Sequence, residues 1–198
     1  MDQTIIIATK NEGKAKEFKE LFNRYGYQIK TLVDFPEIED IPETGSTFAE
    51  NAYQKASAIS KKLNTIVLAD DSGIEVDALD GKPGIYSARF AGEHGNDAAN
   101  NKKLLAELEG LPAEERKANF HCSLVMLGPD RETLSVEGKV YGRILKEGRG
   151  AHGFGYDPLF YMDDIGKTMA ELTSEEKNKI SHRAKALVKL EKQIEDWL

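Results

Sequence analysis

The sequence predicts an α/β fold, in which helices flank a mixed β-sheet and a cleft separates two lobes. Helical and strand patterns alternate in the first half of the chain, whereas strands joined by a tight turn dominate the second half. The run Ile66-Val67-Leu68-Ala69 is apolar throughout and partly β-branched, which is typical of a strand covered on both faces. These observations together favour one sheet with both parallel and antiparallel neighbours.

The composition describes an ordinary globular protein with an acidic balance. The chain has 198 residues, of which 40% are hydrophobic and 31% charged, and its net charge is −7. This size suits one domain or two closely joined lobes with a real core. The acidic balance argues against non-specific nucleic-acid binding, which depends on a basic surface, so we expect no nucleic-acid partner.

The apolar segments predict neither membrane insertion nor secretion. No apolar run approaches the roughly 20 residues that span a bilayer, so we expect no membrane partner. The run 5–8 is far too short for a secretory segment, and we therefore expect a cytoplasmic protein. The single cysteine, Cys122, lies in an apolar stretch and is expected to be an inert buried thiol.

The elements of the first half follow from short local signals. Asn11 is placed to cap a helix after the first strand, and Thr47-Phe48-Ala49-Glu50 is a capping-box pattern. Asp70-Asp71-Ser72-Gly73 is expected to be a turn that ends the apolar strand. The expected strands are 4–8, 28–32, 66–69 and 73–77, and the second helix is expected to run from the capping box to Leu63.

The second half is expected to be richer in strands. Gly128-Pro129-Asp130 is a hairpin signal between two long strand patterns. The glycine-rich segments 80–95 and 148–158 are expected to be loops, and loops of this length are more often functional than idle. The expected strands are 119–127, 133–144 and 159–162, and the expected helices are 96–109 and the C-terminal segment.

The C-terminal helix is predicted to break near Ser181. On one regular helix, Lys177 and Ser181 share one flank, Arg183 lies on the other, and His182 faces away from the packing stripe. These side chains could not converge on one small molecule from that geometry. We therefore expect a new helix to begin at this point, with Ser181 as its cap.

Two adjacent carboxylates at the end of the apolar strand suggest phosphate chemistry. Ligands gather beyond the carboxyl ends of strands in open α/β sheets, and carboxylates there suggest a hard divalent cation with a phosphate substrate. Side chains alternate along a strand, so at most one of Asp70 and Asp71 is expected to face a given ligand. Glu43 is a possible second oxygen donor. The alternative is a polar turn without a ligand.

Two further segments could contact a nucleotide. The strand–loop–helix junction 9–14 offers unpaired amides and a helix N-terminus, which suit a phosphate group, and Lys14 adds a positive charge. The alternative is a capped helix with a solvated lysine. In Gly153-Phe154-Gly155-Tyr156-Asp157-Pro158 the glycines allow a flat ligand to approach closely, and the aromatic face can stack on a base. The alternative is a tight turn with its aromatic side chains in the core.

Six segments taken together resemble the Ham1/RdgB family of inosine/xanthosine triphosphate pyrophosphatases. They occur in the family's order and spacing across nearly the whole chain. One departure is Lys10, where many members carry glycine before the asparagine. The matching segments are Thr9 to Lys14, the Glu43 loop with Asn51-Ala52, Leu68 to Gly73, Gly84 to Arg89, Gly153 to Pro158, and Ser181 to Arg183.

This resemblance implies an elongated α/β fold with a nucleotide-binding cleft between two lobes, formed by residues 1–198 as a single domain, and a homodimer. It implies hydrolysis of ITP, dITP and XTP to the monophosphate and pyrophosphate with Mg²⁺ as cofactor. Two alternatives stay open. One is a related pyrophosphatase that clears modified pyrimidine or methylated nucleotides, and the other is a nucleotide-binding regulator without turnover.

The resemblance also assigns roles by position. It implies that Asp71 is the general base and a metal ligand, that Glu43 is a further metal ligand, and that Lys55 is an extra phosphate contact. We expect Lys14 and Asp71 to meet across one magnesium-bound polyphosphate, and donors from His182, Arg183 or amides near Phe154 to select a 6-oxo purine. The substrate-binding residues implied are Thr9, Lys10, Asn11, Glu12, Gly13, Lys14, Ser72, Phe154, Gly155, Tyr156, Asp157, Lys177, His182 and Arg183.

Overall fold

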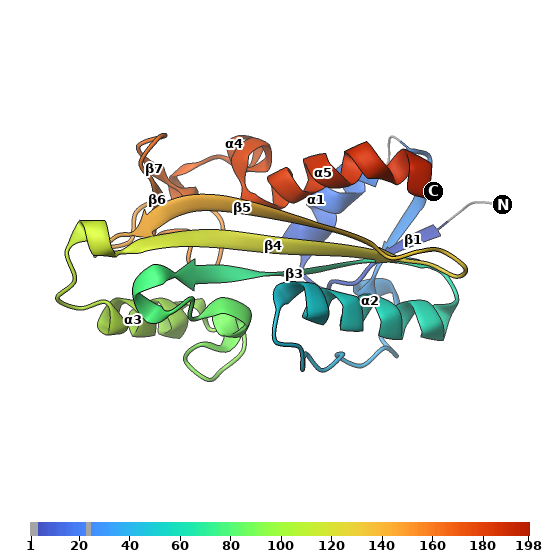
Figure 1. Ribbon diagram of the computed structural model, residues 1–198, viewed down its shortest axis with the longest axis horizontal. Coiled ribbons are helices and arrows are strands. Elements are labelled where there is room, and N and C mark those ends of the chain that lie inside the picture. The colour runs from blue at the N-terminus through green and yellow to red at the C-terminus, as the bar shows by residue number, and fades with distance from the viewer. Residues whose placement is uncertain (1–3, 23–24) are drawn as a thin grey trace. The chain divides into compact units, whose positions relative to one another are not determined.

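The computed structural model describes residues 4–22 and 25–198, and its centre is a seven-stranded mixed sheet (Figure 1). The strand order is β2-β1-β3-β4-β5-β6-β7. β1 pairs in parallel with β2 and β3, whereas β6 pairs antiparallel with β5 and β7. The predicted mixed sheet flanked by helices is therefore confirmed. The strands are β1 (Thr4–Ile7), β2 (Gln28–Thr31), β3 (Ile66–Val76), β4 (Lys117–Leu127), β5 (Leu134–Ile144), β6 (Phe160–Met162) and β7 (Lys167–Thr168).

Five α-helices lie in the described ranges. They are α1 (Glu12–Phe22), α2 (Phe48–Leu63), α3 (Asp97–Glu107), α4 (Ser174–Ile180) and α5 (His182–Trp197). The predicted loop 80–95 contains a short 3-10 helix, η4 (Gly84–Arg89). None of the helices in 4–22 and 25–198 combines the length and the apolar character that crossing a lipid bilayer demands.

The chain forms two compact units. Unit 1 contains residues 1–71, 123–137 and 188–198, and unit 2 contains residues 72–122 and 138–187. The boundary in the first half of the chain falls between Asp71 and Ser72, inside β3. The two units carry different groups of the predicted site residues, and each is described by itself.

In unit 1, α2 covers one face of the parallel strands and α1 lies on the other (Figure 1). Ala52, Ala56 and Ile59 of α2 belong to one buried cluster with Val67 and Ala69 of β3. Because side chains alternate along a strand, the odd-numbered residues of β3 in unit 1 face α2 and the even-numbered ones there face α1. This alternation decides where the two carboxylates of β3 point.

The predicted turn at 70–73 is wrong, because β3 continues without interruption from Ile66 to Val76. β1 ends opposite Leu68, yet the eleven-residue β4 runs alongside as the other neighbour of β3. Hydrogen bonding to such a partner outweighs the local turn preference of Asp, Ser and Gly. Asp70 and Asp71 therefore lie in the middle of a continuous strand rather than in a loop.

In unit 2, the predicted break of the C-terminal helix is confirmed. α4 ends at Ile180, and Ser181 has extended backbone angles of φ −63° and ψ 163°. Its hydroxyl accepts a hydrogen bond from the amide of Ala184 at 3.1 Å, which caps the start of α5. Gly138 of β5 lies directly against this start, at the carbonyl of His182 and the amide of Ala186. Cys122 is buried, as expected.

We predict that Gly138→Ala destabilises the protein by more than about 2 kcal/mol, because the added methyl group overlaps backbone atoms of α5 that cannot move independently. Gly148→Ala is the matched control, since its new methyl group meets mainly the side chain of Pro158 at 3.3 Å. Chemical denaturation of the two variants measures the difference. Equal stability of both would contradict the close approach of α5 to β5.

Candidate active site

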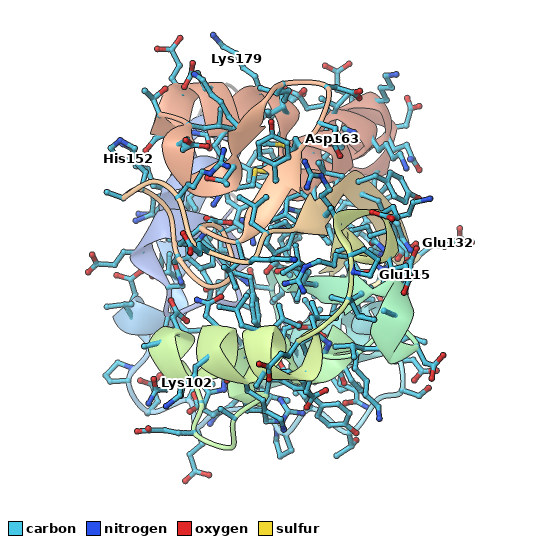
Figure 2. All side chains as sticks on the ribbon, turned by 90° about the vertical axis from the view of Figure 1, so that its left-hand side faces the viewer. Lys102, Glu115, Glu132, His152, Asp163 and Lys179 are labelled. Atoms are coloured by element: carbon cyan, nitrogen blue, oxygen red, sulfur yellow. The ribbon has the colours of Figure 1, made fainter. Side chains whose placement is uncertain are left out.

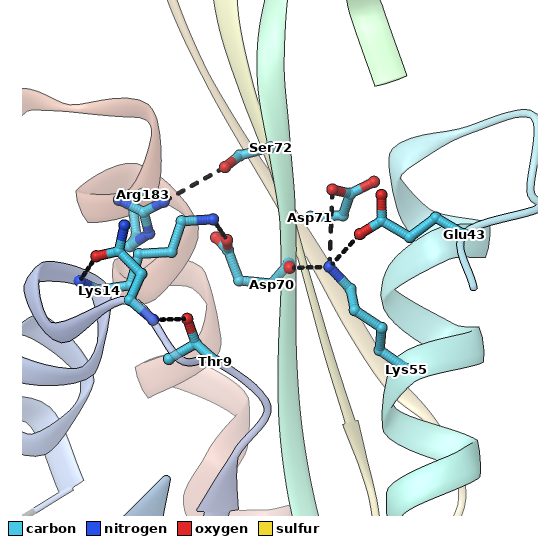
Figure 3. A network of polar contacts seen from close by, with 9 residues as sticks. Thr9, Lys14, Glu43, Lys55, Asp70, Asp71, Ser72 and Arg183 are labelled. Carbon is cyan, nitrogen blue, oxygen red and sulfur yellow. Dashed lines mark hydrogen bonds and ion pairs between the residues drawn. The ribbon is translucent and has the colours of Figure 1, made fainter. Parts of the chain in front are cut away.

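Asp70 and Asp71 point to opposite faces of β3, as the alternation of a strand requires (Figure 3). Both side chains are almost fully buried. Asp70 contacts the ammonium of Lys14 from α1, whereas Asp71 faces Lys55 from α2. Two adjacent acids of one strand thus belong to two separate charge clusters of unit 1.

Lys55 is the centre of the cluster on the α2 side (Figure 3). Its Nζ donates to Glu43 Oε1 at 2.9 Å and to the backbone carbonyl of Asp70 at 2.8 Å, and it lies 3.8 Å from Asp71 Oδ1. Burial disfavours the charge on Lys55, but the carboxylates of Asp71 and Glu43 more than offset this, and the pKa of Lys55 lies above its ordinary value. Lys55 therefore stays protonated and holds the two acids together.

Asp71 has an environment suited to a proton acceptor near neutral pH. Burial raises the pKa of the Asp71 carboxyl from 3.8 to about 6; Lys55 and Asn51 oppose this shift, while Glu43 and Asp70 add to it. A carboxylate with such a pKa is ionised at neutral pH and is a stronger base than an ordinary aspartate. The residue that the resemblance names as general base thus has the electrostatics that this role needs.

The loop that carries Glu43 is fixed by three side chains of α2. The amide of Thr44 donates to Gln54 at 3.0 Å, that of Gly45 to Asn51 at 2.8 Å, and that of Ser46 to Glu50 at 2.6 Å. The hydroxyl of Thr47 accepts the amide of Glu50, so the predicted N-cap is present. Three consecutive amides are thus satisfied by one helix, which holds Glu43 in place beside Lys55.

Glu43 and Asp71 form the group that fits a magnesium ion. Both carboxylates approach the same ammonium, so their oxygens converge on one small volume. Mg²⁺ is commonly bound by one or two carboxylates, with water and substrate phosphates completing its shell. No group of three or more His, Cys, Asp or Glu side chains suited to a metal occurs in the part of the chain that the structure describes. Within these residues, Glu43 and Asp71 are therefore the pair of acids that could share one ion.

The predicted phosphate loop lies at the end of β1, on the α1 side. Thr9 accepts the amide of Asn11 at 3.0 Å, and Asn11 accepts the amide of Lys14 at 3.0 Å as the cap of α1, which begins with Glu12 and Gly13. Lys10 is exposed and pairs with Asp40 at 2.7 Å. The loop thus forms a capped helix start, in which Lys10 is exposed and Lys14 is directed toward Asp70.

Lys14 lies on the opposite face of β3 from Asp71. Its ammonium pairs with Asp70, which points to the other face of β3. The reason is the uninterrupted strand: with no turn at 70–73, neighbouring side chains cannot face the same side. A polyphosphate contacted by both residues stays a prediction.

In unit 2, residues 153–157 form a tight loop that is held from several sides. Asp157 Oδ2 accepts the amide of Phe154 at 3.0 Å and the ammonium of Lys177 at 2.5 Å. The hydroxyl of Tyr156 donates to the carbonyl of Ser87 in η4 at 2.7 Å, and burial raises the pKa of this hydroxyl. The ring of Phe154 remains 44% exposed, with the Lys177 ammonium 4.7 Å from its centroid.

The remaining predicted residues of unit 2 follow the helix break. His182 is buried and its ring stacks on Phe120, with centroids 4.9 Å apart. Arg183 is also buried and donates to the hydroxyl of Ser72 at 3.3 Å. The break at Ser181 therefore points both side chains inward, which one regular helix from 174 to 197 would not do.

The predicted acids and lysines of unit 1 thus form two clusters on opposite faces of β3, and unit 2 carries an aromatic and basic group. Sequence reasoning gave no role to Asp70 as the partner of Lys14, or to Asn51 as the support of the Glu43 loop. The i, i+4 spacing of Asn51 and Lys55 on a predicted helix was the available signal for the second of these.

Solved structures of known proteins share this fold. The chain resembles the Staphylococcus aureus Ham1 protein, with a TM-score of 0.90, 46% identity, and 98% of this chain and 99% of that chain covered. It also resembles a HAM1 protein from Coxiella burnetii, with a TM-score of 0.91, 39% identity and the same coverage. This chain and both of these proteins therefore share one α/β fold.

The chain belongs to the Ham1 family, whose model matches residues 5–193. A relative from Geobacillus kaustophilus, named dITP/XTP pyrophosphatase, is 58% identical over 192 residues, which cover 97% of this chain and 94% of that protein. The family resemblance inferred from the sequence is thereby confirmed.

We predict that Asp71→Asn stabilises the metal-free protein at pH 7.5. The folded state binds the Asp71 proton more tightly than the unfolded chain does, so ionisation destabilises the fold as pH rises from about 4 to about 6. Removing the charge should recover on the order of 1 to 3 kcal/mol above pH 6 and little below pH 4. Thermal unfolding in a chelator measures this, with exposed Asp164→Asn as the control. A Tm of Asp71→Asn below that of the wild type at pH 7.5 would contradict a raised pKa for Asp71 in the folded protein.

Proposed function

We propose that the protein hydrolyses the non-canonical purine nucleoside triphosphates ITP, dITP and XTP to the monophosphate and pyrophosphate. The observation that carries the proposal is the cluster of Glu43, Lys55 and Asp71, in which a buried carboxylate of raised pKa lies beside a second acid and a cation. Relatives of this chain are named dITP/XTP pyrophosphatases, which supports dITP and XTP as substrates and pyrophosphate as a product.

The reaction is the attack of water on the α-phosphorus. Asp71 accepts the proton of the water as its oxygen bonds to the α-phosphorus, the bond from this phosphorus to the bridging oxygen breaks, and pyrophosphate leaves. Lys55 stabilises the negative charge that the phosphates carry in the transition state. Positioning and charge neutralisation supply most of the rate, since phosphoryl transfer needs little covalent assistance.

Glu43 and Asp71 are the residues that would hold Mg²⁺. The ion supplies Lewis acidity and offsets phosphate charge when it is bound. Lys55 occupies the space between these two acids, so its ammonium would shift toward a phosphate oxygen as substrate arrives. The four rotatable bonds of the lysine side chain allow this movement without a change in α2.

Base recognition is assigned to the group in unit 2. Phe154 offers its exposed ring for stacking, and the buried side chains of Lys177, His182 and Arg183 are the candidate donors to the 6-oxygen of hypoxanthine or xanthine. An adenine amino group would leave such donors unpaired, at a cost of about 1–3 kcal/mol each. This difference favours ITP over ATP.

We further propose that the protein acts in the cytoplasm as a homodimer, the assembly that the family resemblance implies. Light scattering of the purified protein after gel filtration tests the dimer. A mass of one chain at micromolar concentration would contradict it.

We predict that the protein with Mg²⁺ releases pyrophosphate from ITP, dITP and XTP at least about 100-fold faster than from ATP, because two or more unpaired donors would each reduce binding of adenine. Separate measurement of pyrophosphate and orthophosphate over a nucleotide panel checks this. Orthophosphate as the first product, or faster turnover of a modified pyrimidine nucleotide, would overturn the proposal. Binding of ITP without any product would indicate a regulator instead.

We predict that Asp71→Asn lowers kcat by at least about 100-fold while ITP still binds, because the variant loses the proton acceptor but keeps the shape of the side chain. Asp70→Asn is the matched control on the opposite face of β3. It should weaken the ion pair that positions Lys14, and should therefore raise KM more than it lowers kcat. Equal kcat losses in both variants would show that Asp71 has no special role.

A further inference from the structure

Two side chains of α3 hold both peptide groups of Gly155. The amide of Gly155 donates to Asp97 Oδ2 at 2.7 Å, and its carbonyl accepts from Asn101 Nδ2 at 2.9 Å. Asp97 and Asn101 are four residues apart and therefore lie on the same face of α3. These contacts join residues more than 50 positions apart in the sequence, and neither α3 residue belongs to the site predicted from the family resemblance.

The backbone conformation of Gly155 needs to be fixed by hydrogen bonds of this kind. Its φ is +60°, in the left-handed region that glycine enters without steric cost. Glycine also has many other conformations available, so an unheld Gly155 would let the loop move. Fixing its N–H and C=O together removes that freedom at the residue that follows Phe154.

Further contacts within the loop fix the position of Phe154 next to Gly155. The amide of Phe154 is bound by Asp157, and Gly153 packs so closely on the same carboxylate that a Cβ would overlap it. Lys177 binds Asp157 and also lies over the Phe154 ring. The amides of Phe154 and Gly155 are therefore already engaged, whereas the ring of Phe154 is exposed.

We propose that Asp97 and Asn101 are positioning residues that hold the loop so that Phe154 presents its ring to the purine base, and that they set the affinity for the base. This inference rests on the proposed function. The hold is the same before and during the reaction, so its loss weakens binding of the ground state and the transition state equally. Such a loss raises KM and leaves kcat unchanged.

The experiment compares Asn101→Ala with Lys102→Ala, its neighbour on α3, which points outward into solvent (Figure 2). Asn101→Ala should raise KM for ITP about 5- to 10-fold with kcat within about twofold, as expected for one lost hydrogen bond that orders a loop. Lys102→Ala should leave both constants unchanged. Asp97→Ala should match Asn101→Ala, and Asp97→Asn, which keeps an acceptor oxygen, should restore much of the affinity.

Inhibition by inorganic tripolyphosphate, which has no base, distinguishes a loss of base positioning from a general loss of structure. Its inhibition constant should be the same in the wild type and in Asn101→Ala. An unchanged KM for ITP in Asn101→Ala, or an equal weakening of ITP and tripolyphosphate, would overturn the inference.

Calorimetric binding of inosine monophosphate gives a readout without turnover. It should weaken in Asn101→Ala by the same factor as KM rises, and equal affinity in wild type and variant would overturn the inference. Failure of the wild type to release pyrophosphate from ITP would overturn the proposed function instead, and the binding of inosine monophosphate would still decide the role of Asn101.

Discussion

The uninterrupted course of β3 through Asp70 and Asp71 is the constraint on which the candidate site depends. A strand sends successive side chains to opposite faces, so two adjacent acids must serve two different clusters. Asp71 joins Glu43 and Lys55 on the α2 side, and Asp70 joins Lys14 on the α1 side. The strand thus separates the aspartate proposed for proton transfer from the aspartate that pairs with Lys14, although the two side chains have the same chemistry.

The ion pairs of this site have a charge pattern that contacts to a metal ion and a phosphate could replace. Buried carboxylates are costly unless they are paired, and here lysines supply the pairs. Lys55 lies between Glu43 and Asp71, where an incoming metal ion and phosphate would present the same pattern of positive and negative charge. The same residues therefore partly offset one another's charge in the metal-free protein and would complement a metal-bound polyphosphate.

Local patterns predicted most of the fold and many features of the site. The break at Ser181 followed from a geometric argument about which side chains one helix can bring together, and the cap at Asn11 followed from residue type. The continuous strand could not be predicted in this way, because its ladder partner β4 lies about 50 residues further along the chain. The pairing of Lys14 with Asp70 and the hold of Asn101 on Gly155 join residues of similar separation, and residue type alone does not specify such partners.

The most direct test of the account is a double-mutant cycle on metal binding. Mn²⁺ affinity would be measured by electron paramagnetic resonance for the wild type, Glu43→Gln, Asp71→Asn and the double variant, with inosine monophosphate present. If both carboxylates hold one ion, each single change weakens Mn²⁺ binding and the double variant loses less than the sum of the two. Strictly additive losses, or unchanged affinity in either single variant, would contradict the assignment of Glu43 and Asp71 to one metal-dependent site.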